Sequence, residues 1–278
     1  MTFELIHTGV LQGLILAIIA FGIMIPFRFL NFPDLTAEGA YPLGGAISAC
    51  LITLGVPQIS AIALSMLGAG IMAIATAQVA LRLKVNSLLA GIILSTMAYS
   101  INLRMMAKPN IALFNYGGFN FGTLSLAAII CTCLAMFYCF LRTDFGLRLR
   151  AVGLNPAFAA RCEISINKYT SLGLFIAGSM FGLAGSLIVQ IQQFMDVGIG
   201  VGIVIHGLAS LMIGEAIAGT SSLTRQLTAP VIGALIYQQV QGLALSFGLA
   251  PSDLKFFTGA VVLIVLSLKK RGSNTLAK

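Results

Sequence analysis

Tryptophan is absent from the sequence, histidine occurs twice, and charged residues fill only 9% of the positions. A soluble globular domain carries about 25% charged residues. With 58% hydrophobic residues and a mean hydropathy of +1.00, this chain could not cover a water-facing surface. The composition therefore excludes an ordinary soluble protein and predicts an integral membrane protein.

Motifs for catalysis, nucleotide binding and metal binding are also missing. The dipeptide Gly-Lys does not occur, so there is no G-x-x-x-x-G-K-[ST] phosphate loop, and neither H-E-x-x-H nor G-x-S-x-G is present. His206 is expected to be a core histidine rather than a ligand. The five cysteines lie in or beside apolar runs and predict small buried hydrophobic side chains, not disulfides. We expect a non-catalytic protein without a cofactor of its own.

The net charge of +8 does not indicate nucleic acid, because the basic residues stand in short loops between apolar runs. Placing the N-terminus outside the cell puts thirteen Lys and Arg residues on the inner side and three on the outer side. The inner side would receive Arg28, Arg82, Lys84, Arg142, Arg148, Arg150, Arg161, Lys168, Arg225, Lys269, Lys270, Arg271 and Lys278. The outer side would receive Arg104, Lys108 and Lys255. We therefore expect a multi-pass protein of the cell (inner) membrane, with no nucleic-acid partner.

Nine apolar segments are long enough to be candidate spans, since a membrane helix needs about 20 residues. They are residues 5–29, 35–54, 57–81, 87–106, 121–141, 171–191, 198–219, 227–248 and 253–268. The second and seventh are rich in glycine and interrupted by charge. The fold class predicted is all-α, a polytopic transmembrane helical bundle of about eight to ten spans that forms a single domain over residues 1–278.

An inverted repeat is suggested by two similar segments. Asn31-Phe-Pro-Asp34 follows the first span, Gln193-Phe-Met-Asp196 follows the sixth, and each leads into a glycine-rich apolar stretch. Five spans separate them, so the copies would have opposite orientations. Transporters with inverted repeats carry broken helices at corresponding places. We predict a first repeat over about 1–141 and a second over about 171–268, with broken second and seventh helices; a chance match of a few residues is the alternative.

Carboxylates at membrane depth cost about 2.5–3.5 kcal/mol each and persist where they face a cavity or a partner. Asp34, Glu38 and Glu215 are such carboxylates. Helix capping and packing is the alternative interpretation of each. We predict a translocation path at Asp34, Glu38, Tyr41, Asn102 and Asp196, and an inner gate at Glu215.

The longest polar stretch, residues 142–170, is predicted to lie in the cytoplasm. Asn155 followed by Pro156 is a strong helix start, and it predicts a short helix to about Glu163. A helix lying across the cytoplasmic face could dock a soluble partner. The alternative is a positively charged membrane anchor without a partner.

Three blocks of the sequence carry a resemblance to a known family. They are Asn31-Phe-Pro-Asp-Leu-Thr-Ala-Glu-Gly-Ala-Tyr-Pro-Leu-Gly-Gly45; Lys84-Val-Asn-Ser-Leu-Leu-Ala-Gly91 with Tyr99-Ser-Ile-Asn-Leu-Arg104 and Lys108-Pro-Asn-Ile111; and Gly146-Leu-Arg-Leu-Arg-Ala-Val-Gly-Leu-Asn-Pro156, continuing to Gly185. The chain resembles permease subunits of ATP-binding cassette (ABC) importers of the branched-chain amino acid/ribose class, and most closely the tryptophan/tyrosine-type subgroup.

The resemblance implies a permease of a two-permease, two-ATPase assembly, with ATP bound by the partner ATPase, a separate extracytoplasmic solute-binding protein, and a second copy of the permease. It implies alternating-access import of a small polar solute, an amino acid by class. It also implies a coupling helix that docks on the ATPase. The residues expected to couple are Arg148, Arg150, Asn155, Pro156, Phe158, Arg161 and Glu163. Family members usually have Ala-Leu-Gly-Ile where this chain has Arg161-Cys-Glu-Ile164. A secondary, ion-coupled transporter is the alternative function.

Overall fold

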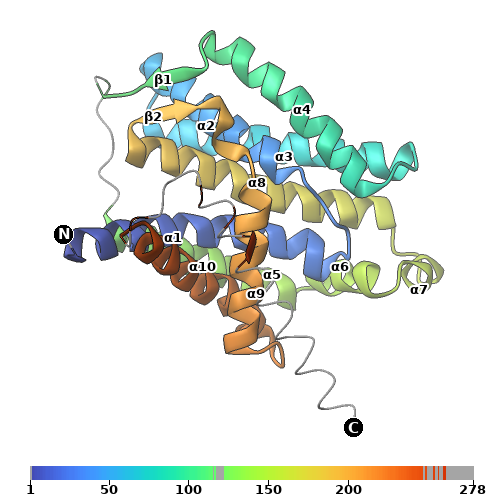
Figure 1. Cartoon of the computed structure of the whole chain (residues 1–278). Coiled ribbons are helices and arrows are strands. Elements are labelled where there is room, and N and C mark those ends of the chain that lie inside the picture. Colours follow the sequence, from blue (N-terminus) through green and yellow to red (C-terminus); the bar gives the residue numbers. More distant parts are fainter. Residues whose placement is uncertain are drawn as a thin grey trace. The chain divides into compact units, whose positions relative to one another are not determined.

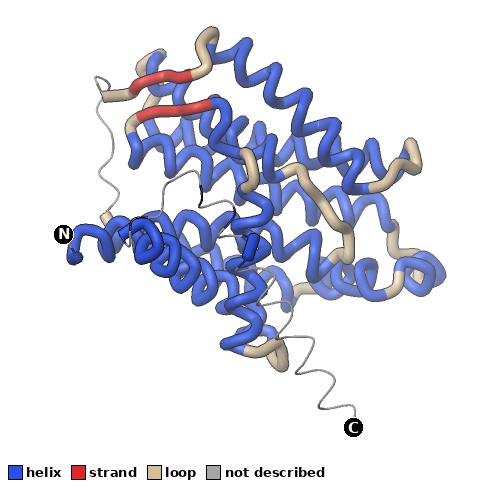
Figure 2. Tube along the Cα trace, viewed as in Figure 1, coloured by secondary structure: helices blue, strands red, loops and turns tan. Residues whose placement is uncertain are grey.

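The computed structural model describes residues 2–114, 116 and 122–246, and beyond these only positions 248, 253, 256, 259 and 260. The described residues are almost wholly helical (Figures 1 and 2). The α-helices are α1 (Thr2–Met24), α2 (Ala37–Thr53), α3 (Gln58–Arg82), α4 (Ser87–Met106), α5 (Thr123–Arg142), α6 (Asp144–Leu154), α7 (Pro156–Arg161), α8 (Ile166–Gln192), α9 (Ile203–Ala218) and α10 (Leu223–Ser246). A π-helix η1 (Ile25–Phe29) extends α1, and a 3-10 helix η2 (Val197–Gly200) precedes α9.

Six helical segments of the described residues are long and apolar enough to cross a membrane. They are Ile6–Phe29, Gln58–Arg82, Ser87–Met106, Thr123–Arg142, Ile166–Gln192 and Val197–Ala218. The transmembrane helical class is therefore confirmed. The second predicted span is the shorter helix α2, with 17 residues, and the eighth corresponds to α10. Most of the ninth, at 253–268, lies outside the described residues.

A two-stranded antiparallel ribbon joins two loops and was not predicted. Strand β1 (Asn110–Ala112) pairs with β2 (Phe194–Asp196), with Ile111 opposite Met195. The ribbon lies at one end of its unit, and α6 and α7 lie at the other (Figure 1). That arrangement matches the predicted topology, in which the loops after the fourth and sixth spans share the outer side.

The chain divides into two compact units, residues 1–20, 122–134 and 205–278 in unit 1 and residues 21–121 and 135–204 in unit 2. Unit 2 is built around α8, which packs against both α2 and α3. Small residues permit this close approach. A Cβ added to Gly178 would lie 2.6 Å from the methyl carbon of Ala73, and one added to Gly185 would lie 2.9 Å from the backbone nitrogen of Gly45. Membrane helices commonly associate through such small residues.

Unit 1 contains α9 and α10, which also approach through glycines. A Cβ on Gly233 would lie 2.6 Å from the nitrogen of Gly214. The amide of Gln238 donates to the side-chain oxygen of Gln12 at 2.6 Å, which ties α10 to α1. Side-chain hydrogen bonds of this kind join membrane helices.

Gly185→Ala should lower the melting temperature of the detergent-solubilised protein. Its methyl group would meet backbone on α2 (the nitrogen of Gly45 at 2.9 Å and the carbonyl carbon of Tyr41 at 3.1 Å), so a rotamer change cannot relieve the clash. Overpacking costs about 1–3 kcal/mol. Gly68→Ala is the matched control, because its Cβ would meet only the flexible end of Ile47. Equal melting temperatures for the two variants would contradict this account.

Of the two helices predicted to be broken, the seventh is interrupted between η2 and α9, but the second is not, because α2 runs without a break from Ala37 to Thr53 through Pro42. The chain breaks before α2 instead. The first span ends in the π-helix η1, which contains Pro26, and residues 30–36 then run to α2 with Asn31 in the left-handed region at φ 48°. The later break is β2 followed by η2 before α9. In each break the aspartate accepts the N–H two residues on: Asp34 from Thr36 at 2.9 Å and Asp196 from Gly198 at 2.6 Å. The two segments thus share the same aspartate turn, which agrees with a repeated motif. The inverted symmetry of the repeat stays a prediction.

Candidate functional site

A small cavity of about 190 Å³, lined by both polar and apolar residues, lies in unit 2 between α2, α4 and the segment that follows β2. Its lining residues are Glu38, Pro42, Ser95, Thr96, Tyr99, Asn102, Val197, Gly200 and Val201. Residues 95–102 belong to the central and later turns of α4, which runs from Ser87 to Met106. If α4 spans the bilayer, the cavity therefore lies near the membrane midplane, where transporters with broken helices bind their solutes.

Glu38 joins the two helix breaks at this cavity. Its half-buried carboxylate lies in the first turn of α2, and its Oε1 accepts the N–H of Gly202 at 3.2 Å. Gly202 has φ +84°, a backbone conformation that favours glycine. A Cβ at Gly200 would lie 2.6 Å from Cγ of Pro42, so glycine is needed for η2 to reach α2. The glycine run after β2 thus brings a backbone donor to the carboxylate.

Three polar side chains of α4 complete the wall. Asn102 is 1% exposed, and its Oδ1 has no hydrogen-bond partner among the described residues. The hydroxyl of Ser95 donates to the carbonyl of Leu35 at 3.1 Å, and that of Thr96 donates to the carbonyl of Ile93 at 2.8 Å. A buried amide oxygen without a partner is uncommon in native structures and calls for an explanation.

Asp34 has a local structural role. Its Oδ1 accepts both the N–H and the hydroxyl of Thr36, and the Thr36 oxygen, lying 2.9 Å from the hydroxyl of Thr76, can accept the hydrogen of that second hydroxyl. The aspartate is 4% exposed and does not line the cavity. These bonds fix the start of α2 against α3, and they correspond to the capping alternative for this residue.

The other predicted path and gate residues lie elsewhere. Tyr41 is 4% exposed within α2, and Asp196 sits on β2; neither lines the cavity. Glu215 is a buried residue of α9 in unit 1. Of the six residues predicted for the path and the gate, the structure therefore brings Glu38 and Asn102 together at one cavity.

Helices α6 and α7 form the polar end of unit 2. The side chain of Asn155 accepts the N–H of Phe158 at 3.0 Å, so the predicted Asn-Pro helix start is confirmed. Helix α7 ends at Arg161, two residues before the predicted end, and Glu163 has φ 60°. This left-handed position is where helices favour glycine, and it is the position at which family members usually carry glycine. In this chain a glutamate thus occupies the left-handed backbone position after α7 at which family members usually carry glycine.

The exposed surface of α6 and α7 mixes apolar and basic side chains. Leu154 is 87% exposed and Phe158 is 61% exposed. The exposed polar residues of the predicted coupling set are Arg148, Asn155, Arg161 and Glu163, and Pro156 is exposed with them. Arg150 differs, because it is half-buried and its guanidinium donates to the carbonyl of Leu141 at 3.2 Å. We therefore assign Arg150 to holding α6 against the end of α5.

The α6 helix packs directly on the first helix break. A Cβ at Gly153 would lie 2.7 Å from the carbonyl carbon of Phe29 and 2.8 Å from Cα of Leu30, both of them backbone atoms. Residues 30–36 connect that point to α2 and Glu38. A backbone contact and the chain segment that follows it thus connect the α6–α7 surface to the cavity.

Sequence reasoning missed the hydroxyls of Ser95 and Thr96 and the backbone donor of Gly202. The glycine run at 198–202 was recognised only as part of a repeat. A signal was available for the α4 residues: Ser95, Thr96, Tyr99 and Asn102 recur at spacings of three and four, which places polar groups on one helix face.

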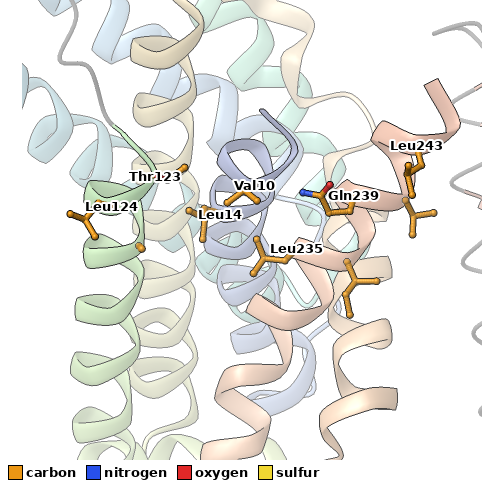
Figure 3. A pocket seen from close by; sticks show the side chains of 10 residues that line it. Val10, Leu14, Thr123, Leu124, Leu235, Gln239 and Leu243 are labelled. Carbon is orange, nitrogen blue, oxygen red and sulfur yellow. The ribbon is translucent and has the colours of Figure 1, made fainter. Parts of the chain in front are cut away.

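A larger groove of about 590 Å³ in unit 1 does not suit a polar solute. Figure 3 shows its lining of mostly aliphatic side chains, including Val10, Leu14, Leu235 and Leu243. Gln239, one of its two polar lining residues, already donates to the carbonyl of Ile6 at 3.2 Å. Among the described residues there is also no group of three or more His, Cys, Asp or Glu that could hold a metal ion.

Comparison with known proteins agrees with this architecture. A "Tyrosine transport system permease protein" of Clostridioides difficile is 34% identical, over 96% of this chain and 94% of the relative. An uncharacterized protein of Rickettsia prowazekii is 29% identical over 96% of this chain and 99% of its own length. The "Probable branched-chain amino acid transport permease protein LivH" of Methanocaldococcus jannaschii is 23% identical over 69% of this chain and 67% of its own length. No solved structure gives a significant match.

A family model described as "Branched-chain amino acid transport system / permease component" matches residues 5–266, nearly the whole sequence. The match agrees with the predicted resemblance and with a multi-pass protein of the cell membrane whose role is transport rather than catalysis. The chain belongs to the family of permease components of branched-chain amino acid transport systems.

Proposed function

We propose that this chain forms the translocation path of an ABC importer for an amino acid and works by alternating access driven by a separate ATPase subunit. The observation that carries the proposal is the contact of Gly153 on α6 with the backbone of Phe29, from which the chain runs directly to α2 and the cavity at Glu38. A displacement of α6 would be transmitted directly to the first helix break, because Gly153 lies against the backbone of Phe29 and Leu30.

The nature of the α6–α7 surface supports docking of a soluble partner. Exposed aromatic and aliphatic residues flanked by arginine, such as Phe158 beside Arg161, are typical of the centre of a protein interface. A positively charged anchor alone would not need apolar groups facing the cytoplasm. We propose that this surface, comprising Arg148, Asn155, Pro156, Phe158, Arg161 and Glu163, binds the ATPase.

An aromatic amino acid is the substrate we propose, on the strength of the 34% identical tyrosine permease. A separate extracytoplasmic solute-binding protein would deliver it, and a second permease copy would complete the assembly. ATP would be bound and hydrolysed by the ATPase partner, since this sequence contains no phosphate loop.

Affinity purification from native membranes tests the partnership. The tagged chain, solubilised in mild detergent, should bring down a soluble subunit with a phosphate-binding loop. Replacing the exposed residues Arg148, Phe158 and Arg161 by serine should remove that subunit while the permease still elutes as a folded species on gel filtration, because no buried residue of α6 or α7 is changed. Retention of the subunit by this variant would refute the assigned docking surface. Absence of such a subunit from the wild-type eluate would count against the ABC importer itself.

A further inference from the structure

The cavity beside Glu38 offers hydrogen-bond acceptors but no fixed positive charge. Its only charged side chain is Glu38, and neither Lys, Arg nor His is among its lining residues. Glu38 forms no ion pair with any residue that the structure describes, and it receives one neutral N–H, from Gly202. A carboxylate at membrane depth is costly unless a positive group meets it.

The hydroxyl groups strengthen this acceptor character. A serine or threonine hydroxyl has one hydrogen and two lone pairs. The hydrogen of Ser95 is donated to Leu35, and that of Thr96 is donated to Ile93. Only their lone pairs remain available to a solute, so both side chains can serve as acceptors without losing a bond.

Asn102 adds an independent observation. It lines the cavity, is 1% exposed, and keeps an Oδ1 without a hydrogen-bond partner. This oxygen has less than 1 Å² of accessible surface, so a donor in the cavity reaches it when the Asn102 side chain rotates toward the cavity. Glu38, Asn102 and the two hydroxyls therefore call for the same complement, a group with several N–H donors and a positive charge.

We propose that this cavity binds the primary ammonium group of the transported solute. An ammonium carries three donors and no acceptor, which matches the acceptor atoms of Glu38, Ser95 and Thr96 in an otherwise largely apolar wall. The volume of about 190 Å³ is below the roughly 300–1,000 Å³ of most ligand pockets. The cavity therefore fits the ammonium group and a short part of the solute attached to it. Tyr99 supplies an aromatic wall beside this group. A solute bearing only a carboxylate would be repelled by Glu38.

This inference rests on the proposed function only for the choice of an amino acid as solute. Binding can be measured on the full-length permease alone, in lipid nanodiscs, without ATPase, ATP or binding protein. Tritiated tyramine is the probe, because it keeps the ammonium and the phenol of tyrosine but lacks the carboxylate. The competitors are L-tyrosine and 3-(4-hydroxyphenyl)propionate, which lacks the amine.

We expect tyramine to bind saturably and L-tyrosine to displace it, while a 100-fold excess of the propionate does not. Glu38→Gln should weaken tyramine binding at least 10-fold, because it removes the charge but keeps an oxygen that can accept from Gly202. Asn102→Leu should also weaken binding without lowering the melting temperature, because it replaces an amide whose buried Oδ1 has no hydrogen-bond partner by an apolar group of similar size. Glu4→Gln, a change at an exposed carboxylate of α1, should bind as the wild type does.

Three results would overturn the proposal: no saturable tyramine binding, displacement by the propionate as effective as by L-tyrosine, or unchanged affinity in both Glu38→Gln and Asn102→Leu. None of these would affect the proposed ATP-driven import, which is measured separately by uptake. Conversely, uptake that needs no ATPase would refute the proposed function and leave the ammonium site standing.

Discussion

Phe158→Asp should abolish ATP-dependent uptake while leaving the permease folded. Phe158 is 61% exposed on α7, so its replacement removes no core packing. At an interface, however, an aspartate would place an unpaired charge where an aromatic anchor is expected. Losing such an anchor costs about 2 kcal/mol or more, roughly a 30-fold loss of affinity for the ATPase. The measurements are uptake by proteoliposomes and retention of the ATPase on the immobilised permease.

Leu54→Asp is the matched control for Phe158→Asp. Leu54 is 77% exposed and caps the end of α2, at the opposite end of unit 2 from α7. The Leu54→Asp variant makes the same change from an apolar to an acidic side chain, and it should leave ATPase retention unaltered. Equal losses in both variants would show that the effect is not specific to α7 and would contradict the docking assignment.

Gly153→Val should separate ATPase binding from transport. The Cβ would lie 2.7 Å and 2.8 Å from backbone atoms of Phe29 and Leu30, so α6 has to move away from the first helix break. The exposed face of α6 and α7 would stay intact, and the ATPase should still co-purify. Uptake should fall at least 10-fold, and the melting temperature should drop by several degrees through overpacking of about 1–3 kcal/mol.

The control for Gly153→Val is Ala63→Val, at an exposed position of α3, where the added methyl groups meet no packed backbone. It should transport as the wild type does. Wild-type uptake by Gly153→Val would mean that the contact between α6 and Phe29 does not carry the movement. Loss of ATPase binding in that variant would instead mean that docking and transmission cannot be separated at this residue.

Much of the helical framework was predictable because hydropathy and helix signals are local. The span predicted at 87–106 coincides with α4, and the Asn155-Pro156 start of α7 follows from its capping chemistry. The interruption before α9 was also visible, as glycines interrupt an apolar run there, whereas α2 runs without a break through Pro42, Gly44 and Gly45. The membrane class follows from composition alone, since 9% charged residues cannot cover a soluble surface.

The candidate site could be predicted only in part, because it depends on tertiary contacts. Glu38 and Gly202 are 164 positions apart and meet only when η2 packs on α2. The sequence marks Glu38 as unusual but does not reveal its donor. Similarly, Arg150 resembles its neighbours in a basic stretch, and only the fold shows it donating to Leu141 rather than facing outward.

The two helix breaks meet at the cavity, which gives the repeated motif a physical meaning. The first break contributes Glu38, and the second contributes Gly200 and Gly202. The aspartates that precede them, Asp34 and Asp196, each hold a turn by accepting the N–H two residues on. In this arrangement the aspartates shape the breaks and the glutamate lines the cavity.

The central claim, import driven by a partner ATPase, is tested most directly by uptake of L-tyrosine into proteoliposomes that hold the permease, its co-purified ATPase and the solute-binding protein. Uptake should require ATP on the ATPase side and persist when sodium and proton gradients are collapsed. Uptake that continues without ATP while an ion gradient is held, and stops when that gradient is removed, would contradict the account and identify an ion-coupled secondary transporter.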